Sequence, residues 1–292
     1  MSIYNYIYTN FLNPLQSLPF QFYYALRKNY DSLNSQKRNN HIVVSLTSFP
    51  PRFSTLHYTL KSILNQTMKP DRLLLYLSKE EVKDESELPL SILDLKKNGL
   101  QIIYVDDNLK PHKKYYYAMQ HYPDSLIITI DDDVIYDKNL VADLYNSFLK
   151  YPSAVSSRRV HKIACDGYKD LLPYNNWHYE YKKETTPSHE LVSTGIGGVL
   201  YPPKLLPAET FNADKIKELC LNADDIWLKF MELKNNIPVV WVKSKRVHPL
   251  SIKGAQKDSL QKNNYHENQN DKYIIALQNY YGINLASEQW KN

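Results

Sequence analysis

The sequence is short of glycine, of cysteine and of long apolar runs. Seven glycines among 292 residues argue against a glycine-rich loop as the main device for binding phosphates. Two cysteines, Cys165 and Cys220, are too few for a disulfide framework or a zinc site, and they favour a reduced intracellular protein. No stretch reaches the roughly 20 apolar residues that a membrane-spanning helix needs. We therefore expect a cytoplasmic protein without a membrane span.

The chain also lacks a strong excess of charge. Lys plus Arg number 36 and Asp plus Glu number 31, which gives a formal net charge of +5. This mild basicity suits a phosphate-bearing substrate or an anionic membrane surface, and no nucleic acid partner is expected because no dense basic stripe is present. Hydrophobic residues make up 43% of the chain, which is enough for a sizeable core.

The first 40 residues differ from those that follow. They are rich in aromatic side chains, lack the basic start and clean apolar core of a signal peptide, and carry Arg27 and Lys28 after the aromatic stretch. Three interpretations stay open for this segment: packing on the main domain, a partly ordered lead-in, or peripheral contact with the inner face of the plasma membrane. We expect a lead-in over residues 1–40, one main domain over 41–257 and a helical tail over 258–292.

Apolar strands and helices alternate through the first half. The patterns predict strands over residues 41–46, 72–78, 100–107 and 125–130. Between and after them they predict helices over residues 54–66, with Ser54 as the N-cap, 90–97, 113–121 and 138–150. Near-continuous apolar strands separated by helices predict a parallel sheet covered on both faces.

Polar runs follow three of these strands. "TSFPPR" (47–52) comes after the first strand, "VDDN" (105–108) after the third and "DDDV" (131–134) after the fourth. Ligands of open α/β sheets bind at the carboxyl ends of the strands. We therefore expect the three runs to form the lip of one crevice.

The acidic triplet is the most informative of these runs. Alternate residues of an extended segment face the same way, so Asp131 and Asp133 point together and Asp132 points aside. Two converging carboxylates suit Mg²⁺ or Mn²⁺, and Asp132 can accept a hydrogen bond from a ribose or sugar hydroxyl. The alternative is a solvated acidic turn that caps the next helix.

The second half is less regular. "AVSSRRVHKIACDG" predicts an edge strand or hairpin, "LVSTGIGGVLYPP" (191–203) a single strand whose glycines allow close approach, and "IPVVWV" (237–242) the last buried strand. Asp224 and Asp225 open a helix, where they are either a cap or a general base. In "VHPLSIKG", His248 is either a structural histidine or a metal ligand, and Lys253 is a candidate phosphate-binding cation.

Taken in order, six segments resemble a known family. They are "VVSLTSFPPRF", "VDDNLKPHKKY", "YPDSLIITIDDDVIYDKNLV", "GIGGVLYPP", "NADDIWLKF" and "VHPLSIKG". The set resembles bacterial glycosyltransferases of the GT-A fold, similar to family 2 and of the type found in capsule, O-antigen and lipooligosaccharide clusters. The resemblance spans about residues 41–254, so it implies that residues 41–257 are the catalytic domain. It implies an α/β fold with a Rossmann-like mixed sheet and helices on both faces.

The resemblance also implies roles for individual residues. Asp131, Asp133 and His248 would hold Mn²⁺ or Mg²⁺, and Asp225 would be the catalytic base, with Asp224 as the alternative. Asp106 or Asp107 would approach the nucleotide's base or ribose. The residues expected around the nucleotide-sugar are Thr47, Ser48, Arg52, Asp107, Lys114, Asp132, Gly197, Gly198 and Lys253.

The implied reaction is a single, inverting transfer of a sugar from a nucleotide-sugar, with a UDP-sugar favoured, to a hydroxyl of a glycan or lipid-linked acceptor in surface polysaccharide synthesis. The "Q-x-x-R-W" feature of processive synthases is absent. Two alternatives remain open. A haloacid-dehalogenase-like phosphatase also places "D-x-D-x-V" after an apolar strand, although normally after the first one. A sugar-nucleotide-binding protein without turnover would need the same site.

Overall fold

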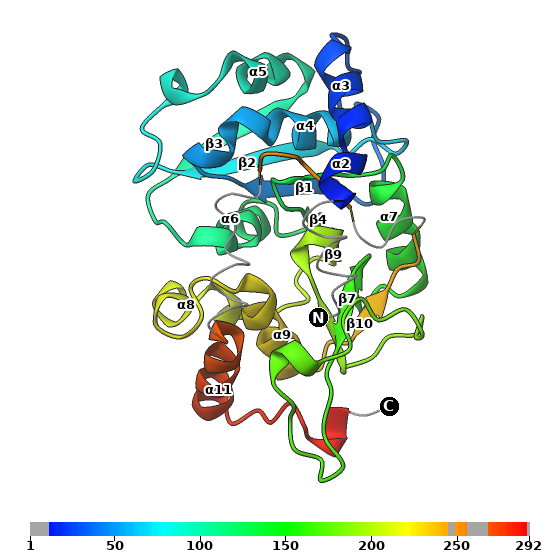
Figure 1. Cartoon of the computed structure of the whole chain (residues 1–292), viewed down its shortest axis with the longest axis vertical. Coiled ribbons are helices and arrows are strands. Elements are labelled where there is room, and N and C mark those ends of the chain that lie inside the picture. The colour runs from blue at the N-terminus through cyan, green and yellow to red at the C-terminus, as the bar shows by residue number, and fades with distance from the viewer. Residues whose placement is uncertain (1–11, 245–248, 256–267, 291–292) are drawn as a thin grey trace.

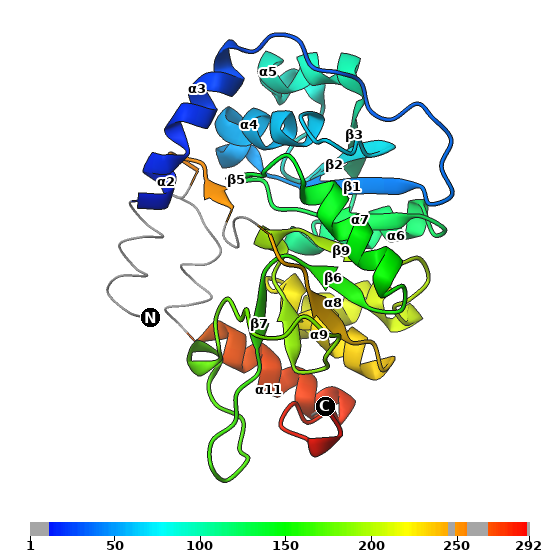
Figure 2. The same ribbon diagram turned by 90° about the vertical axis from the view of Figure 1, so that its right-hand side faces the viewer.

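The computed structural model describes residues 12–244, 249–255 and 268–290. Its centre is a seven-stranded mixed sheet, around which the helices are arranged (Figures 1 and 2). In sheet order the strands are β10 (Val239–Trp241), β6 (Val155–Ser157), β9 (Val199–Tyr201), β4 (Leu126–Thr129), β1 (Ile42–Thr47), β2 (Arg72–Ser78) and β3 (Leu100–Val105). All neighbours are parallel except β9, which runs antiparallel to both β4 and β6. The expected mixed α/β fold is confirmed.

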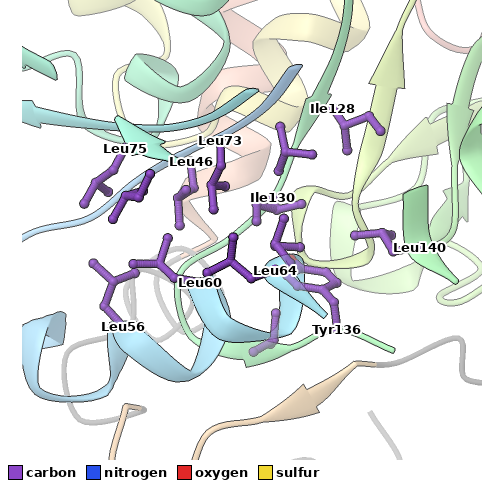
Figure 3. Packing of buried hydrophobic residues seen from close by; sticks show 14 of the residues in the cluster. Leu46, Leu56, Leu60, Leu64, Leu73, Leu75, Ile128, Ile130, Tyr136 and Leu140 are labelled. Atoms are coloured by element: carbon purple, nitrogen blue, oxygen red, sulfur yellow. The ribbon is translucent and has the colours of Figure 1, made fainter. Parts of the chain in front are cut away.

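Strand β1 shows why its continuous apolar run forms a central strand. Ile42, Val44 and Leu46 are fully buried on one side of the sheet, against helix α4 (Phe53–Leu64). Figure 3 shows Leu46 and neighbouring strand residues facing Leu56 and Leu60 of that helix. Each such side chain contributes about 1.5–3 kcal/mol on burial. A polar residue at any of these positions would break this layer.

The opposite face of the sheet is covered by helix α6 (Lys113–His121). Val43 of β1 and Ile127 of β4 pack there with Ala118 of the helix. The helix contacts β1, β2 and β4. Because alternate residues of β1 are buried on opposite sides, both faces of the sheet are covered, as the sequence predicts.

The helices of the first half mostly match their predicted ranges. Helices α6 and α7 (Leu140–Lys150) are confirmed, but the range 90–97 divides into α5 (Leu90–Leu93) and a 3₁₀ helix (Asp94–Asn98) that ends at Gly99. The prediction that Ser54 caps α4 is wrong. Pro50 and Pro51 begin a 3₁₀ turn, so the chain is already helical at Arg52 before α4 starts.

The predicted single strand over residues 191–203 is also wrong. It divides into β8 (Leu191–Ser193) and β9, which are separated by the 3₁₀ turn Gly195–Gly197 and by Gly198 at φ +83°. A positive φ suits glycine and ends the extended run. Residues 154–167, predicted as an edge strand or a hairpin, do not form a hairpin. β6 joins the interior of the main sheet, while β7 (Val160–Lys162) pairs with β8 in a separate two-stranded sheet.

Helices from both ends of the chain complete the molecule. Helices α2 (Asn13–Gln16) and α3 (Leu18–Leu26) lie at its outer edge, beside the two-stranded sheet of β5 (Val134–Ile135) and β11 (Leu250–Ser251) (Figure 2). At the other end, α11 (Gln269–Tyr281) packs on α8 (Ala213–Leu219) and α9 (Asp224–Lys234). Within the described ranges, none of the helices is both long and apolar enough to cross a membrane.

Candidate active site

A cavity of about 440 Å³ opens at the carboxyl ends of β1 and β4. Its walls come from the loop after β1, the acidic triplet after β4, the start of α6, the turn after β8 and the start of α9. The sequence places these segments up to 178 residues apart, between Thr47 and Asp225, and the sheet brings them together. The predicted crevice is therefore present, although residues 105–108 do not line it.

Backbone contacts fix the acidic triplet at its edge. The Asp131 N–H donates to the Tyr136 hydroxyl at 2.9 Å, and the Thr59 hydroxyl donates to the Asp132 carbonyl at 2.9 Å. The Asp133 carbonyl accepts from the Ile252 N–H at 2.8 Å. All three carboxylates line the cavity. This arrangement differs from a freely solvated acidic turn.

Lys114, at the start of α6, joins the triplet to the late acid pair. Its Nζ lies 2.7 Å from Asp131 Oδ1 and 2.9 Å from Asp224 Oδ2. Burial alone would lower the pKa of Lys114, but the carboxylates of Asp131, Asp224 and Asp225 outweigh it and hold that pKa well above its usual value. Lys114 is therefore a permanent cation between the two acidic groups.

Arg52, from the loop after β1, pairs with the other end of the triplet. Its Nη1 lies 2.8 Å from Asp133 Oδ2 and 3.9 Å from Asp132 Oδ1. The Ser48 hydroxyl donates to Asp132 Oδ2 at 2.5 Å. Burial raises the pKa of Asp132 to about 7 in spite of Arg52. Asp132 and Asp133 thus share Arg52, whereas Asp131 faces Lys114.

The two acids at the start of α9 have different partners. Asp224 is paired with Lys114, while Asp225 Oδ1 accepts a hydrogen bond from the backbone N–H of Gly195 at 3.0 Å. Burial and the neighbouring Asp224 raise the pKa of Asp225 well above the usual aspartate value. A carboxylate with a raised pKa is a stronger base. The pair is therefore more than a helix cap, because both side chains are directed at the cavity rather than at their own helix.

The donor groups of the cavity suit a hard divalent cation. Among the described residues the five aspartates form ion pairs with two cations, Arg52 and Lys114, while the other cations of the lining, Lys110, Lys113 and Arg159, pair elsewhere. Carboxylate oxygens are the ligands that Mg²⁺ and Mn²⁺ prefer, and excess negative charge favours their binding. Among the described residues no three His, Cys, Asp or Glu side chains already converge as a metal cluster. The donor set fits a metal held by one or two carboxylates together with a phosphate-bearing ligand.

A second wall of the cavity is aromatic. Tyr174 and Tyr179 line it with His161, whose ring lies 4.2 Å from that of Tyr179. Arg159 also lines it, and its Nη1 donates to the Thr194 hydroxyl at 2.9 Å. Flat rings beside hydrogen-bonding groups suit the faces and hydroxyls of sugars.

Several predicted site residues lie in this cavity and others do not. Thr47, Ser48, Arg52, Lys114, the triplet and the acid pair line it. Asp107 is instead exposed and pairs with Lys217 at 3.0 Å, and Asp106 pairs with Lys79. Lys253 is exposed and does not line the cavity, although the preceding residue, Ile252, contacts the Asp133 backbone. His248 lies outside the described residues.

The glycines at the site also differ from the prediction. Gly197 and Gly198 do not line the cavity themselves. A Cβ on Gly197 would meet Arg159 of the cavity wall, and one on Gly198 would meet the buried Leu140, so these two glycines allow close packing behind the wall. Gly195 is the glycine at the acids, since its Cβ would lie 2.8 Å from Lys114 Nζ and 3.0 Å from Asp131 Oδ1.

Sequence reasoning missed most of the second wall. Tyr174, Tyr179 and His161 come from a loop-like aromatic segment and an assumed edge strand, where no periodicity points to a site. Glu81 also lines the cavity and pairs with Lys110 and Lys113 at 3.2 Å each. It follows β2, whose carboxyl end was given no role in the site from the sequence. The density of tyrosines in the loop-like aromatic segment was the one feature of the sequence that could have indicated a binding surface there.

Comparison with solved structures supports the fold. A mannosyltransferase from Pyrobaculum calidifontis, solved with GDP-Man and Mn²⁺, matches with a TM-score of 0.50 at 10% identity, over 95% of this chain and 74% of that one. Glucosyl-3-phosphoglycerate synthase from Mycobacterium tuberculosis matches with a TM-score of 0.32 at 13% identity, over 44% of this chain and 50% of that one. A search of curated proteins found no match. The sheet and the first of these similarities define the class of fold as GT-A-like.

The family follows from the sequence. Residues 51–199, half of the chain, match the model of glycosyl transferase family 2, and the chain belongs to that family. It is therefore a glycosyltransferase that uses a nucleotide-sugar. The matched range includes Arg52, Lys114, the acidic triplet and Gly195. The phosphatase alternative is wrong: the acidic triplet follows β4, after three strands and their helices, within a glycosyltransferase domain.

Proposed function

We propose that this chain is a metal-dependent, inverting glycosyltransferase of surface polysaccharide synthesis, which transfers one sugar from a nucleotide-sugar to a hydroxyl of a glycan or lipid-linked acceptor. One observation carries the proposal. In a family 2 glycosyltransferase, a single cavity holds the triplet Asp131–Asp133 and the pair Asp224–Asp225, joined by Lys114. The bacterial capsule, O-antigen or lipooligosaccharide type of the enzyme is part of the same proposal.

The donor is placed on the side of the cavity formed by the loop after β1. Thr47 and Ser48 line that side with Arg52, so they offer hydroxyls and a cation to a nucleoside diphosphate. We keep a UDP-sugar as the favoured donor. A GDP-sugar is the second candidate, since the similar mannosyltransferase was solved with GDP-Man.

Mn²⁺ or Mg²⁺ would be held by Asp133 and Asp131, and His248 stays a predicted third ligand outside the described residues. When bound, the ion supplies positive charge against the diphosphate that leaves the sugar. Arg52 and Lys114 restrain the triplet from either end, which keeps both carboxylates oriented at the cavity. Their charge also offsets part of the repulsion among the five acids.

Asp225 is the base in this proposal. Its raised pKa suits removal of a proton from an acceptor hydroxyl, and the Gly195 N–H holds the carboxylate in place. Tyr174, Tyr179 and Arg159 would bind the acceptor on the opposite wall. The deprotonated oxygen attacks the anomeric carbon opposite the departing diphosphate, so the configuration inverts.

A donor screen tests the proposal. Nucleotide release is measured with UDP-, GDP-, CMP- and dTDP-sugars in Mn²⁺, with and without EDTA, and the anomeric configuration of the product is read by NMR. We expect release from one donor class, loss of release in EDTA and an inverted product. Full activity in EDTA contradicts the metal, and a retained anomer contradicts the base.

Matched variants place the reaction in the cavity. Asp133→Ala is expected to lose metal-dependent donor binding, whereas Asp124→Ala, an exposed aspartate paired with Lys204, is expected to behave as wild type. The role in surface polysaccharide is tested in the host cell, where loss of the gene should shorten or remove that polymer. If no donor turns over under any condition, the alternative of a binding protein without turnover is favoured.

A further inference from the structure

The helical segment formed by α2 and α3 buries three polar side chains together with Pro14 and Tyr24. Ser17, between the two helices, has φ −78° and ψ −19°, so the helical course is nearly unbroken. Asn13, Ser17 and Gln21, spaced by four residues, are 0%, 0% and 9% exposed. Their polar groups are satisfied: Asn13 donates to the Pro249 carbonyl and accepts from the Ser251 N–H, and Gln21 donates to Ser17. This spacing is that of one helix face.

The outward side of the same segment is apolar. Twelve large apolar side chains are exposed in the described part of the chain, and seven of them are Leu12, Leu15, Leu18, Phe20, Phe22, Tyr23 and Leu26. Figures 1 and 2 both show α3 at the periphery of the molecule. A surface helix in water normally has the opposite arrangement. A contiguous apolar patch of this kind marks an interaction surface.

The charge pattern favours a lipid surface as the partner. Residues 1–26 contain no Asp, Glu, Lys, Arg or His, although 23% of the whole chain is charged. Arg27 and Lys28 follow at once, and neither forms an ion pair with a carboxylate of the described residues. Five tyrosines and three phenylalanines lie in the same 26 residues. Arg27 donates instead to neutral groups, among them the Tyr23 hydroxyl, and Lys28 is exposed. Aromatic and aliphatic side chains bounded by cations without a carboxylate partner are typical of helices that lie in an anionic membrane interface.

A second copy of the chain fits this face less well. Each copy carries a formal charge of +5, and two apposed segments would bring their Arg27 and Lys28 side chains together. We therefore propose that the outward face of residues 12–26 docks on an anionic lipid bilayer, with α3 lying parallel to the membrane surface. The docking positions the enzyme for an acceptor held at the membrane, but it does not depend on the proposed reaction.

Vesicle co-sedimentation of the full chain tests the docking. Vesicles of phosphatidylcholine with phosphatidylglycerol are compared with vesicles of phosphatidylcholine alone, at low and high salt. The wild type is expected to bind the anionic vesicles and to lose affinity in high salt. The double variant Phe22→Ser/Leu26→Ser is expected to lose at least about tenfold in partitioning, since each apolar side chain buried in the interface contributes that much or more.

Ile275→Ser is the matched control, because Ile275 is also exposed but lies on α11 at the opposite end of the molecule (Figure 1). A second variant, Phe22→Trp, keeps the face apolar and is expected to add blue-shifted fluorescence that brominated lipids quench. Failure of the wild type to bind anionic vesicles overturns the proposal. Binding of the double variant Phe22→Ser/Leu26→Ser as tight as that of the wild type overturns it as well. If that variant instead abolishes a dimer seen by analytical ultracentrifugation, the face belongs to a second copy. None of these readouts requires turnover.

Discussion

At the residue scale, the structure gives different partners to two neighbouring acids that the sequence could not distinguish. Asp224 and Asp225 are adjacent at the start of α9, and either could rotate inward. The structure pairs Asp224 with Lys114 and leaves Asp225 on the neutral N–H of Gly195. Asp225 thus keeps its carboxylate outside the direct ion pair, and burial together with the neighbouring Asp224 raises its pKa. This difference of partner favours Asp225 as the base.

The first prediction follows from that difference. Asp225→Asn is expected to keep donor binding and to lower acceptor-dependent turnover by at least about a hundredfold, the low end for loss of a general base. Asp224→Asn is expected to lower turnover less, because it removes one partner of Lys114 but leaves the proposed base, Asp225, in place. Asp214→Asn, an exposed aspartate of α8, is the control. Turnover and donor titration of the three variants decide which aspartate is the base. The assignment is reversed if Asp224→Asn lowers turnover more than Asp225→Asn does.

A second prediction concerns Gly195, which sequence reasoning passed over in favour of Gly197 and Gly198. Gly195→Ala would place a methyl group 2.8 Å from Lys114 Nζ, which must then move away from Asp131. We expect turnover to fall at least about tenfold while the fold persists, because the clash is with a side-chain tip and interactions made in the transition state are lost. Gly167→Ala is the matched control, since its Cβ would meet nothing within 4 Å. Unchanged turnover in Gly195→Ala would show that the Lys114 position tolerates a shift.

At the element scale, helix α9 carries a fully buried ion pair away from the cavity. Lys229 and Glu232 are 2% and 0% exposed, with Nζ and Oε2 3.4 Å apart. Burial lowers the pKa of Lys229 and raises that of Glu232 to about 7, although the lysine opposes the second shift. Buried pairs of this kind are costly to break and add little net stability.

This pair gives the third prediction. Between the usual glutamate pKa and about 7, the folded chain holds a proton on Glu232 that the unfolded chain has released. The free energy of unfolding therefore falls as pH rises through this window, by at most about 1.4 kcal/mol per pH unit for one proton. Other buried acids contribute to the wild-type slope, so the measurement is the difference between wild type and Glu232→Gln in urea unfolding from pH 5 to 7. Parallel curves for the two proteins would mean that Glu232 is ionised throughout.

Elements were predicted well where periodicity is uninterrupted. β2 and α6 match their expected ranges because their apolar patterns run without a break, and tertiary packing follows the pattern. The prediction of one strand over residues 191–203 was wrong because an apolar run is typical of a single strand. In the structure the turn Gly195–Gly197 and Gly198 at φ +83° divide the run into two strands that belong to different sheets. Local pattern does not reveal which sheet a short strand joins.

At the scale of the whole molecule, the order of elements was enough to predict a parallel arrangement and its ligand-binding edge. It could not place β9, whose antiparallel insertion between β4 and β6 depends on contacts far apart in sequence. For the same reason the wall of Tyr174, Tyr179 and His161 was not foreseen. We propose that the division into residues 1–40, 41–257 and 258–292 is one of function rather than of folding, because Tyr24 and Leu277 are buried in the core clusters.

The charge of the cavity links the proposed metal to the stability of the whole chain. The five aspartates lie close together and repel one another in spite of Arg52 and Lys114, the two cations that pair with them among the described residues, and a divalent ion bound there would relieve that repulsion. A ligand that binds only the folded state at a hundred times its dissociation constant adds about 2.7 kcal/mol to the free energy of unfolding. Mn²⁺ with a nucleoside diphosphate is therefore expected to raise the melting temperature of the wild type, and Asp133→Ala should lose this shift while Asp124→Ala keeps it. Differential scanning fluorimetry over a Mn²⁺ titration measures both. An equal shift in Asp133→Ala would place the ion elsewhere in the molecule.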